Sequence, residues 1–192
     1  MLISGKAHSG KSTTKDFLIE KLSKIDGIRL FPYSFADPLK YMAKAFGGWN
    51  GEKDELGREF LQGIGKVFRK YDKDIFCKHL INQMDKSNNV FPPHFVLVDD
   101  WRFLNEAEFF TKNPIFDVIK IRIFGRGGLD GQLADDESEV ELPEVNYEVY
   151  ENGLNYGIYN ITVDNKPEVS LETLSSKLDI ALKVISENYI VE

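Results

Sequence analysis

The sequence has a single cysteine, Cys77, among its 192 residues. One cysteine excludes an internal disulfide framework and a metal site built from several thiolates, and this scarcity is typical of proteins in a reducing compartment. Cys77 itself is expected to be a small buried residue rather than a nucleophile. We therefore expect a cytoplasmic protein, located in the host cytoplasm if the chain is viral.

An excess of positive charge and a long apolar run are also missing. The net charge is −7, which argues against a general electrostatic footprint for a nucleic-acid polymer. No apolar run approaches the length that crosses a membrane, and the first residues show no secretory signal pattern. We expect one domain over residues 1–192, with a substantial core and with neither membrane nor nucleic-acid polymer as a partner.

The first fourteen residues contain a glycine-rich phosphate-loop pattern. Gly5 to Ser12 reads Gly-Lys-Ala-His-Ser-Gly-Lys-Ser and fits G-x-x-x-x-G-K-[ST]. A short apolar strand precedes the pattern and a helix-period stretch to about Ile25 follows it, which is the context that confirms such a loop. The pattern predicts backbone N–H groups around a polyphosphate, and a helix that presents its positive end to the anion.

Each residue type in this loop has a physical reason. Gly5 and Gly10 permit the unusual backbone angles and the close approach of the turn. Lys11 is expected to reach the β- and γ-phosphates of ATP, and the Ser12 hydroxyl to bind Mg²⁺. The predicted ATP-binding residues are Gly5, Ala7, His8, Ser9, Gly10, Lys11, Ser12 and Thr13.

A second signal is an apolar run over 95–98 that ends in two carboxylates, Asp99 and Asp100. Such a run suits a strand that is buried on both faces of a parallel sheet. In phosphate-loop proteins an acidic strand end of this kind holds Mg²⁺, directly or through water. Either Asp99 or Asp100 could join Ser12 at the metal, and the sequence does not choose between them.

The segment before this strand predicts a strand at 29–35, then helices. Pro32 indicates an irregular or edge position for the strand, and Asp37 suits the N-cap of the helix that follows. Asp37 is also a candidate carboxylate at the acceptor end of a nucleotide cleft. Two further helices are expected over 56–84.

The first of these two helices carries a row of polar side chains along one flank. Arg58, Gln62, Lys66 and Arg69 recur at three- or four-residue steps. Such a row is either a solvated helix face or a grip for a phosphate and a base edge.

The later part of the chain contains a long irregular stretch over about 125–158. Strands at 117–124 and 159–164 flank it, and an amphipathic helix is expected over 171–188. A connection this long is usually functional or disordered, so we interpret it as a mobile lid. Arg126 is the candidate cation that would swing onto the phosphates.

The order of elements predicts an α/β protein with a three-layer, mostly parallel sheet of the phosphate-loop type. A helical acceptor-binding insertion is expected at about 37–86, in addition to the lid. The size and the lid favour a small-molecule kinase, because the insertion lies where a second substrate would be clamped.

Five stretches carry a family resemblance: the Gly5–Ser12 loop, Ser34-Phe-Ala-Asp-Pro-Leu-Lys40, Arg58…Leu61-Gln62…Arg69, Val98-Asp-Asp-Trp-Arg-Phe-Leu-Asn-Glu106 and Glu137-Ser-Glu139. Together they resemble the deoxynucleoside monophosphate kinases of tailed bacteriophages, over most of the chain to about residue 165. The resemblance implies transfer of the ATP γ-phosphoryl group, with Mg²⁺, to a deoxynucleoside monophosphate.

The resemblance also implies roles by position. Asp37, Arg58, Gln62 and Arg69 would face the acceptor nucleotide, and Asp100 and Arg102 would lie between acceptor and donor. The implied catalytic cations are Lys11, Arg102 and Arg126. No general base is expected, because an acceptor phosphate is already anionic near neutral pH.

Two other functions remain open. One is a kinase of another phosphorylated metabolite, such as phosphomevalonate. The other is a GTP-binding switch, because Asp54-Glu-Leu-Gly57 fits D-x-x-G and Asn165-Lys-Pro-Glu168 nearly fits N-K-x-D. The expected partners are ATP and a deoxynucleoside monophosphate, and a homodimer is left open.

Overall fold

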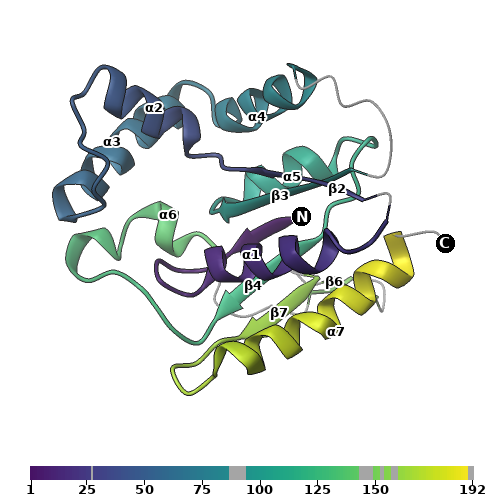
Figure 1. Cartoon of the computed structure of the whole chain (residues 1–192). Coiled ribbons are helices and arrows are strands. Elements are labelled where there is room, and N and C mark those ends of the chain that lie inside the picture. The colour runs from purple at the N-terminus through teal and green to yellow at the C-terminus, as the bar shows by residue number, and fades with distance from the viewer. Residues whose placement is uncertain (27, 87–93, 143–148, 152–153, 157–159, 190–192) are drawn as a thin grey trace.

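The computed structural model describes residues 1–26, 28–86, 94–142, 149–151, 154–156 and 160–189. A five-stranded, all-parallel sheet lies at its centre, in the order β2-β3-β1-β4-β7 (Figure 1). Its strands are β1 (Leu2–Ser4), β2 (Arg29–Tyr33), β3 (His94–Trp101), β4 (Lys120–Phe124) and β7 (Ile161–Asp164). The predicted α/β class with a parallel sheet is confirmed, and the layout is one that Rossmann-like and phosphate-loop proteins share.

The positions of the strands follow from their residues. β1 is the central strand, and Leu2 pairs in register with Val98 of β3 and with Lys120 of β4. β3 lies between β2 and β1, as its continuous apolar run predicts. β2 lies at the edge of the sheet, where Pro32, which has no N–H to donate, is tolerated.

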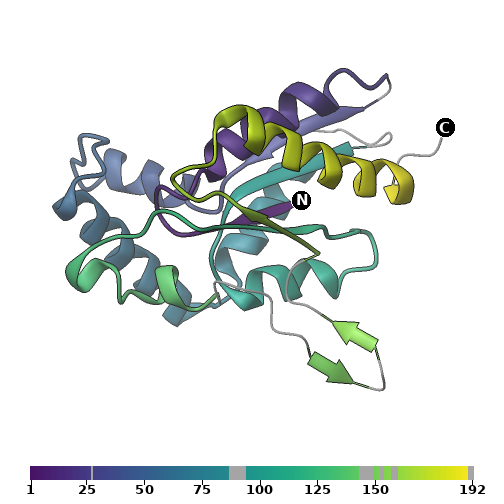
Figure 2. The ribbon, with the colours of Figure 1, turned by 90° about the horizontal axis from the view of Figure 1, so that it is seen from below.

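Helices cover both faces of the sheet. In the described residues these are α1 (Lys11–Leu22), α2 (Asp37–Ala45), α3 (Glu55–Tyr71), α4 (Ile75–Lys86), α5 (Leu104–Thr111), the short α6 (Glu137–Val140) and α7 (Leu171–Tyr189). α1 and α7 lie side by side on one face, whereas α5 and the α2–α4 segment lie toward the other (Figures 1 and 2). Within the described part of the chain, no helix has both the length and the apolar character of a membrane span.

Alternation along the strands divides the core into two clusters. Ile3 and Leu97 pack under α1 and α7, whereas their neighbours Leu2 and Val98 pack toward α2, α4 and α5. The result is a three-layer arrangement with a buried sheet. Cys77 is buried in the second cluster and burial raises the pKa of its thiol, as expected for a packing residue.

The stretch after β4 has more regular structure than the sequence suggested. It contains a 3₁₀ turn (Gly131–Leu133) and α6, and β5 (Val149–Glu151) pairs with β6 (Leu154–Tyr156) in a separate antiparallel hairpin (Figure 2). Elements of three or four residues are too short for a hydrophobic period to reveal them. Residues 143–148, 152–153 and 157–158 of the stretch predicted over about 125–158 lie outside the described residues, as do residues 87–93 before β3.

Candidate active site

A cavity of about 790 Å³ lies at the carboxyl edge of the sheet, between the β1–α1 loop and α3. Parallel strands bring their carboxyl ends to one edge, which is why distant segments of the chain meet there. The predicted site residues that line it are Ala7, His8, Gly10, Lys11, Ser12, Thr13, Asp37, Arg58, Gln62, Arg69, Asp99, Asp100 and Arg102. Gly5, Ser9 and Arg126 are described by the structure but lie outside this lining.

The loop over residues 5–12 curls around its own lysine. Lys11 Nζ donates hydrogen bonds to the carbonyl oxygens of Gly5 at 2.7 Å and Lys6 at 2.6 Å. Gly10 has a φ of +101°, which favours glycine, and His8 has a φ of +61°. A Cβ on Gly5 would lie 2.6 Å from the carbonyl oxygen of Ile123. The two glycines are therefore required by the path of the loop.

The Lys11 amine is largely removed from water. Burial, reinforced by the nearby positive charge of Arg102, lowers the pKa of Lys11 to about 7, although the Glu139 carboxylate opposes part of this shift. The protein groups around this amine therefore stabilise its charged form poorly. An anion bound beside it would restore the charge, so the site favours negatively charged ligands.

The two carboxylates at the end of β3 have different partners. Asp99 Oδ2 lies 3.3 Å from Ser12 Oγ and 2.8 Å from Lys15 Nζ, so it faces the beginning of α1. Asp100 accepts hydrogen bonds from Ser34 Oγ at 2.7 Å and from the backbone N–H groups of the next two residues, Phe35 and Ala36, at 2.9 Å each. Of the two carboxylates, Asp99 rather than Asp100 lies beside Ser12.

The expectation that Asp37 caps α2 is wrong. Ala36 already has helical angles (φ −81°, ψ −5°), so Asp37 is the first residue inside the helix. The Asp100 carboxylate, reaching across from β3, accepts the N–H of Ala36 just before the helix begins. Asp37 still lines the cavity, where it pairs with Lys40 at 2.9 Å.

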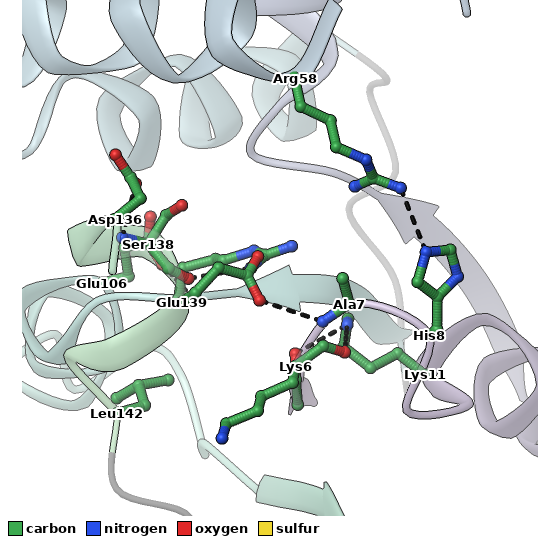
Figure 3. A network of polar contacts seen from close by, with 12 residues as sticks. Lys6, Ala7, His8, Lys11, Arg58, Glu106, Asp136, Ser138, Glu139 and Leu142 are labelled. Carbon is green, nitrogen blue, oxygen red and sulfur yellow. Dashed lines mark hydrogen bonds and ion pairs between the residues drawn. The ribbon is translucent and has the colours of Figure 1, made fainter. Parts of the chain in front are cut away.

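The polar row on α3 divides in two. Arg58, Gln62 and Arg69 line the cavity, whereas Lys66 pairs with Asp136 at 2.7 Å. Arg58 also contacts the 5–12 loop, because its Nη2 lies 3.3 Å from Nε2 of His8 (Figure 3). The row is therefore more than a solvated face, since three of its members face the loop across one cavity.

Arg69 and the cavity wall form a stacked arrangement. The Arg69 guanidinium carbon lies 4.1 Å from the centre of the Phe103 ring and 5.7 Å from that of Phe76. Both rings line the same cavity. Stacking restricts the guanidinium to one plane, which leaves its edge available for a polar ligand.

Glu139 of α6 reaches the 5–12 loop from a distant part of the sequence. Its Oε2 accepts the backbone N–H of Ala7 at 3.1 Å (Figure 3). Its other oxygen pairs with Arg102. Arg102 also donates to the carbonyl oxygen of Ser138 at 2.9 Å. No individual role was predicted for Glu139, because its signals were only an acidic run over 135–139 and its place in the Glu137-Ser-Glu139 stretch.

Arg126 does not lie where the sequence placed it. Its guanidinium donates to the carbonyl and side-chain oxygens of Asn165, at 2.6 and 2.7 Å, and to the carbonyl oxygens of Lys166 and Val169, at 3.1 Å each. Asn165 in turn donates to the carbonyl oxygen of Ser9 at 2.8 Å. Four acceptors hold Arg126 against the β7–α7 connection, so the prediction that it covers the phosphates is not met in this structure.

The Asp54-Glu-Leu-Gly57 segment, which fits D-x-x-G, lies at the N-terminus of α3. Asp54 is the N-cap of α3, and its side chain accepts the N–H of Gly57 at 2.8 Å. A D-x-x-G segment that reads a γ-phosphate would follow a strand of the sheet, whereas this one begins a helix. The motif is explained by helix capping.

The cavity is basic although the chain is acidic. Its lining includes seven Lys or Arg side chains and five Asp or Glu side chains among the described residues. One acid, Glu106, accepts the N–H groups of Arg102 at 2.9 Å and Phe103 at 3.1 Å, and burial raises its pKa to about 8. At neutral pH Glu106 adds little negative charge, so the balance in the cavity favours an anionic ligand.

Replacing Glu106 by glutamine is expected to remove a pH-dependent loss of stability. The folded protein keeps the Glu106 proton between about pH 4.5 and 8, whereas the unfolded chain releases it, so stability falls as pH rises through this window. Glutamine keeps an oxygen acceptor for both N–H groups and does not ionise. Denaturant unfolding at pH 5 and pH 8.5 measures the effect, and an equal loss in wild type and Glu106→Gln would contradict it.

Comparison with known proteins adds no assignment. No protein-family model matches the chain, and no curated protein matches it. A parallel α/β layout hosts many unrelated functions, so the fold alone does not decide among them. The function has to be argued from the residues that line the cavity.

Proposed function

We propose that the protein is an ATP-dependent kinase that converts deoxynucleoside monophosphates to diphosphates. The observation that carries this proposal is one cavity with Lys11 and Ser12 on one wall and Arg58, Gln62 and Arg69 on the opposite wall. The cavity has a volume of about 790 Å³, and anion-binding side chains lie on both of its walls. This arrangement fits a donor polyphosphate on one wall and an acceptor phosphate on the other.

The donor binds at the 5–12 loop, as in other phosphate-loop proteins. The contact between the Glu139 carboxylate and the N–H of Ala7 supports this, because an anionic oxygen already occupies a loop amide. A phosphate oxygen of ATP takes the place of that carboxylate. Lys11 then exchanges its two carbonyl partners for the phosphates, and the positive end of α1 faces the same anion.

The residues beside the loop fit a magnesium ion. Ser12 Oγ and the Asp99 carboxylate converge within 3.3 Å and offer the oxygen ligands that Mg²⁺ prefers. These two residues would hold the metal, which would neutralise charge on the phosphate oxygens when bound. Lys15 pairs with Asp99 in this structure and would yield that carboxylate. Asp100 instead holds the turn before α2.

The acceptor binds against α3. Arg58 and Arg69 grip its phosphate, Gln62 contacts the base edge, and Arg102 lies between the two substrates once the Glu139 carboxylate is displaced. The acceptor phosphate is already anionic and needs no general base, so the protein has only to align the reactants and neutralise charge. The 37–86 segment is then the acceptor-binding insertion.

The segment after β4 serves as part of the lid. Leu129, Ser138 and Glu139 line the cavity, so residues 125–142 are in position to exclude water from it. Exclusion matters because attack of water on ATP would waste the phosphoryl group. Arg126 anchors this segment to the β7–α7 connection rather than acting on the phosphates.

A ligand that spans both walls tests this assignment. Adenosine and a deoxynucleoside joined by five phosphates would occupy donor and acceptor sites at once, and linkage should strengthen binding about 100-fold or more over ATP. We expect it to compete with ATP and with the acceptor. Competition with ATP alone, and no gain in affinity, would contradict a two-substrate cavity.

Replacing Arg58 by alanine is expected to raise KM for the acceptor about tenfold or more and to leave KM for ATP nearly unchanged, because one charge-assisted hydrogen bond to a phosphate is lost. Lys70→Ala is the matched control, since Lys70 is an exposed cation on the same helix outside the cavity lining. Steady-state kinetics with each substrate varied in turn gives both constants. An equal rise in both constants would argue against an acceptor role.

A further inference from the structure

The outer face of α3 carries an exposed apolar stripe. Leu56, Phe60, Val67 and Tyr71 are 74, 37, 69 and 88% exposed, and a Cβ on Gly63, between them, would meet nothing within 4 Å. Steps of four, three, four and four residues place all five on one side of the helix. At 100° per residue this side lies opposite the cavity-facing flank, and α3 runs along the outer edge of the molecule (Figure 1). A stripe of this kind on a helix is typical of an interaction surface.

The stripe is symmetric about its glycine. Leu56 comes seven residues before Gly63 and Tyr71 eight after it, whereas Phe60 comes three before and Val67 four after. A second copy of α3, antiparallel and related by a two-fold axis near Gly63, would therefore set Leu56 against Tyr71 of the other copy and Phe60 against Val67. The glycine at the crossing point permits a close approach of the two helices.

The charges beside the stripe pair about a centre one residue before that of the stripe. Glu55 and Glu59 lie on one flank in the first half of α3, Lys66 and Lys70 lie on the same flank in the second half, and all four are exposed. In the antiparallel pair, Glu55 lies beside Lys70 of the other copy, and Glu59 beside Lys66, which also contacts Asp136 of its own chain. The surface is thus complementary to itself in the antiparallel orientation.

We propose that two copies of this chain associate through α3, antiparallel and crossing at Gly63. Phe46, 84% exposed, extends the surface onto the end of α2, because its neighbour Gly47 lies against the Phe60 ring. The two cavities remain open, since they lie on the opposite side of each helix. The association does not depend on the catalytic proposal.

Single cysteines test the orientation. In the antiparallel pair, position 56 lies beside position 71 of the other copy, whereas the two copies of position 56 are about 20 Å apart. We expect a disulfide-linked dimer when Leu56→Cys and Tyr71→Cys are mixed and oxidised, and little from either alone; native Cys77 is buried and does not interfere. Linking of Leu56→Cys with itself, or linking in the mixture no greater than for Ser176→Cys on α7, would overturn the proposal.

Analytical ultracentrifugation tests the surface itself. Val67→Glu should raise the dimer dissociation constant about tenfold or more, because both copies lose an apolar contact. Ile115→Glu is the matched control, since Ile115 is 81% exposed and belongs to the connection between α5 and β4. Circular dichroism confirms that both variants are folded. A wild-type protein that stays monomeric at about 100 µM, well above the range of a specific dimer, or equal effects of the two variants, would refute the interface.

Discussion

Lys11→Ala is expected to lower kcat about 1,000-fold while the protein stays folded, because in the proposed reaction its amine is the cation beside the transferred phosphoryl group. Folding should survive, since burial already disfavours the charged amine and lowers its pKa to about 7. The carbonyl oxygens of Gly5 and Lys6 lose a donor, but they lie beside the open cavity, where water can replace it.

The control for this variant is Lys6→Ala. Lys6 belongs to the same loop but its side chain is outside the cavity lining, so its loss should leave turnover within about twofold of wild type. Coupled ADP release at saturating ATP compares the two variants, and thermal unfolding checks that each is folded. Near-normal turnover in Lys11→Ala would remove the basis for a phosphate-binding loop.

The second large effect is expected at the end of β3, where the two carboxylates should respond differently. Asp99→Asn is expected to lower kcat about 100-fold and to raise the Mg²⁺ concentration needed for half-maximal rate, because Asp99 lies beside Ser12. Asp100→Asn is expected to cost about 1–3 kcal/mol of stability instead, because charged hydrogen bonds to the Ser34–Ala36 turn are weakened.

Magnesium titrations of the rate, with denaturant unfolding of each variant, separate these two outcomes. A variant pair with the effects exchanged, so that Asp100→Asn shifts the Mg²⁺ requirement and Asp99→Asn only unfolds more easily, would place the metal at the other carboxylate. Equal Mg²⁺ dependence in both variants and in wild type would argue against a metal at this edge of the sheet.

Local sequence signals predicted the loop at residues 5–12 and most of the sheet beside it. The loop pattern, the apolar run of β3 and the position of Pro32 each depend on a few adjacent residues, and the structure places β1, β3 and β2 accordingly. The four-residue step from Arg58 to Gln62 likewise predicted that they share a helix flank, and the structure shows that both line the cavity. These signals succeed because the period and the turn residues carry the information within one element.

Contacts between distant segments could not be predicted in this way. Glu139 reaches Ala7 across 132 residues of sequence, and no periodicity reports such a contact. Arg126 follows Gly125 into a loop, and only the folded chain shows that the carbonyl groups after β7 hold it. Asp99 and Asp100 point to opposite sides of β3, and the sequence does not show which side the beginning of α1 occupies.

The most direct test of the proposed kinase activity is ADP release from Mg-ATP, measured with and without each of a panel of acceptors. The panel comprises dGMP, dTMP, dCMP, dAMP, the ribonucleotides and phosphomevalonate. We expect release that depends on one or more deoxynucleoside monophosphates, with the matching diphosphate as the product. Release with phosphomevalonate alone, release that needs no acceptor, or no release at all would contradict it.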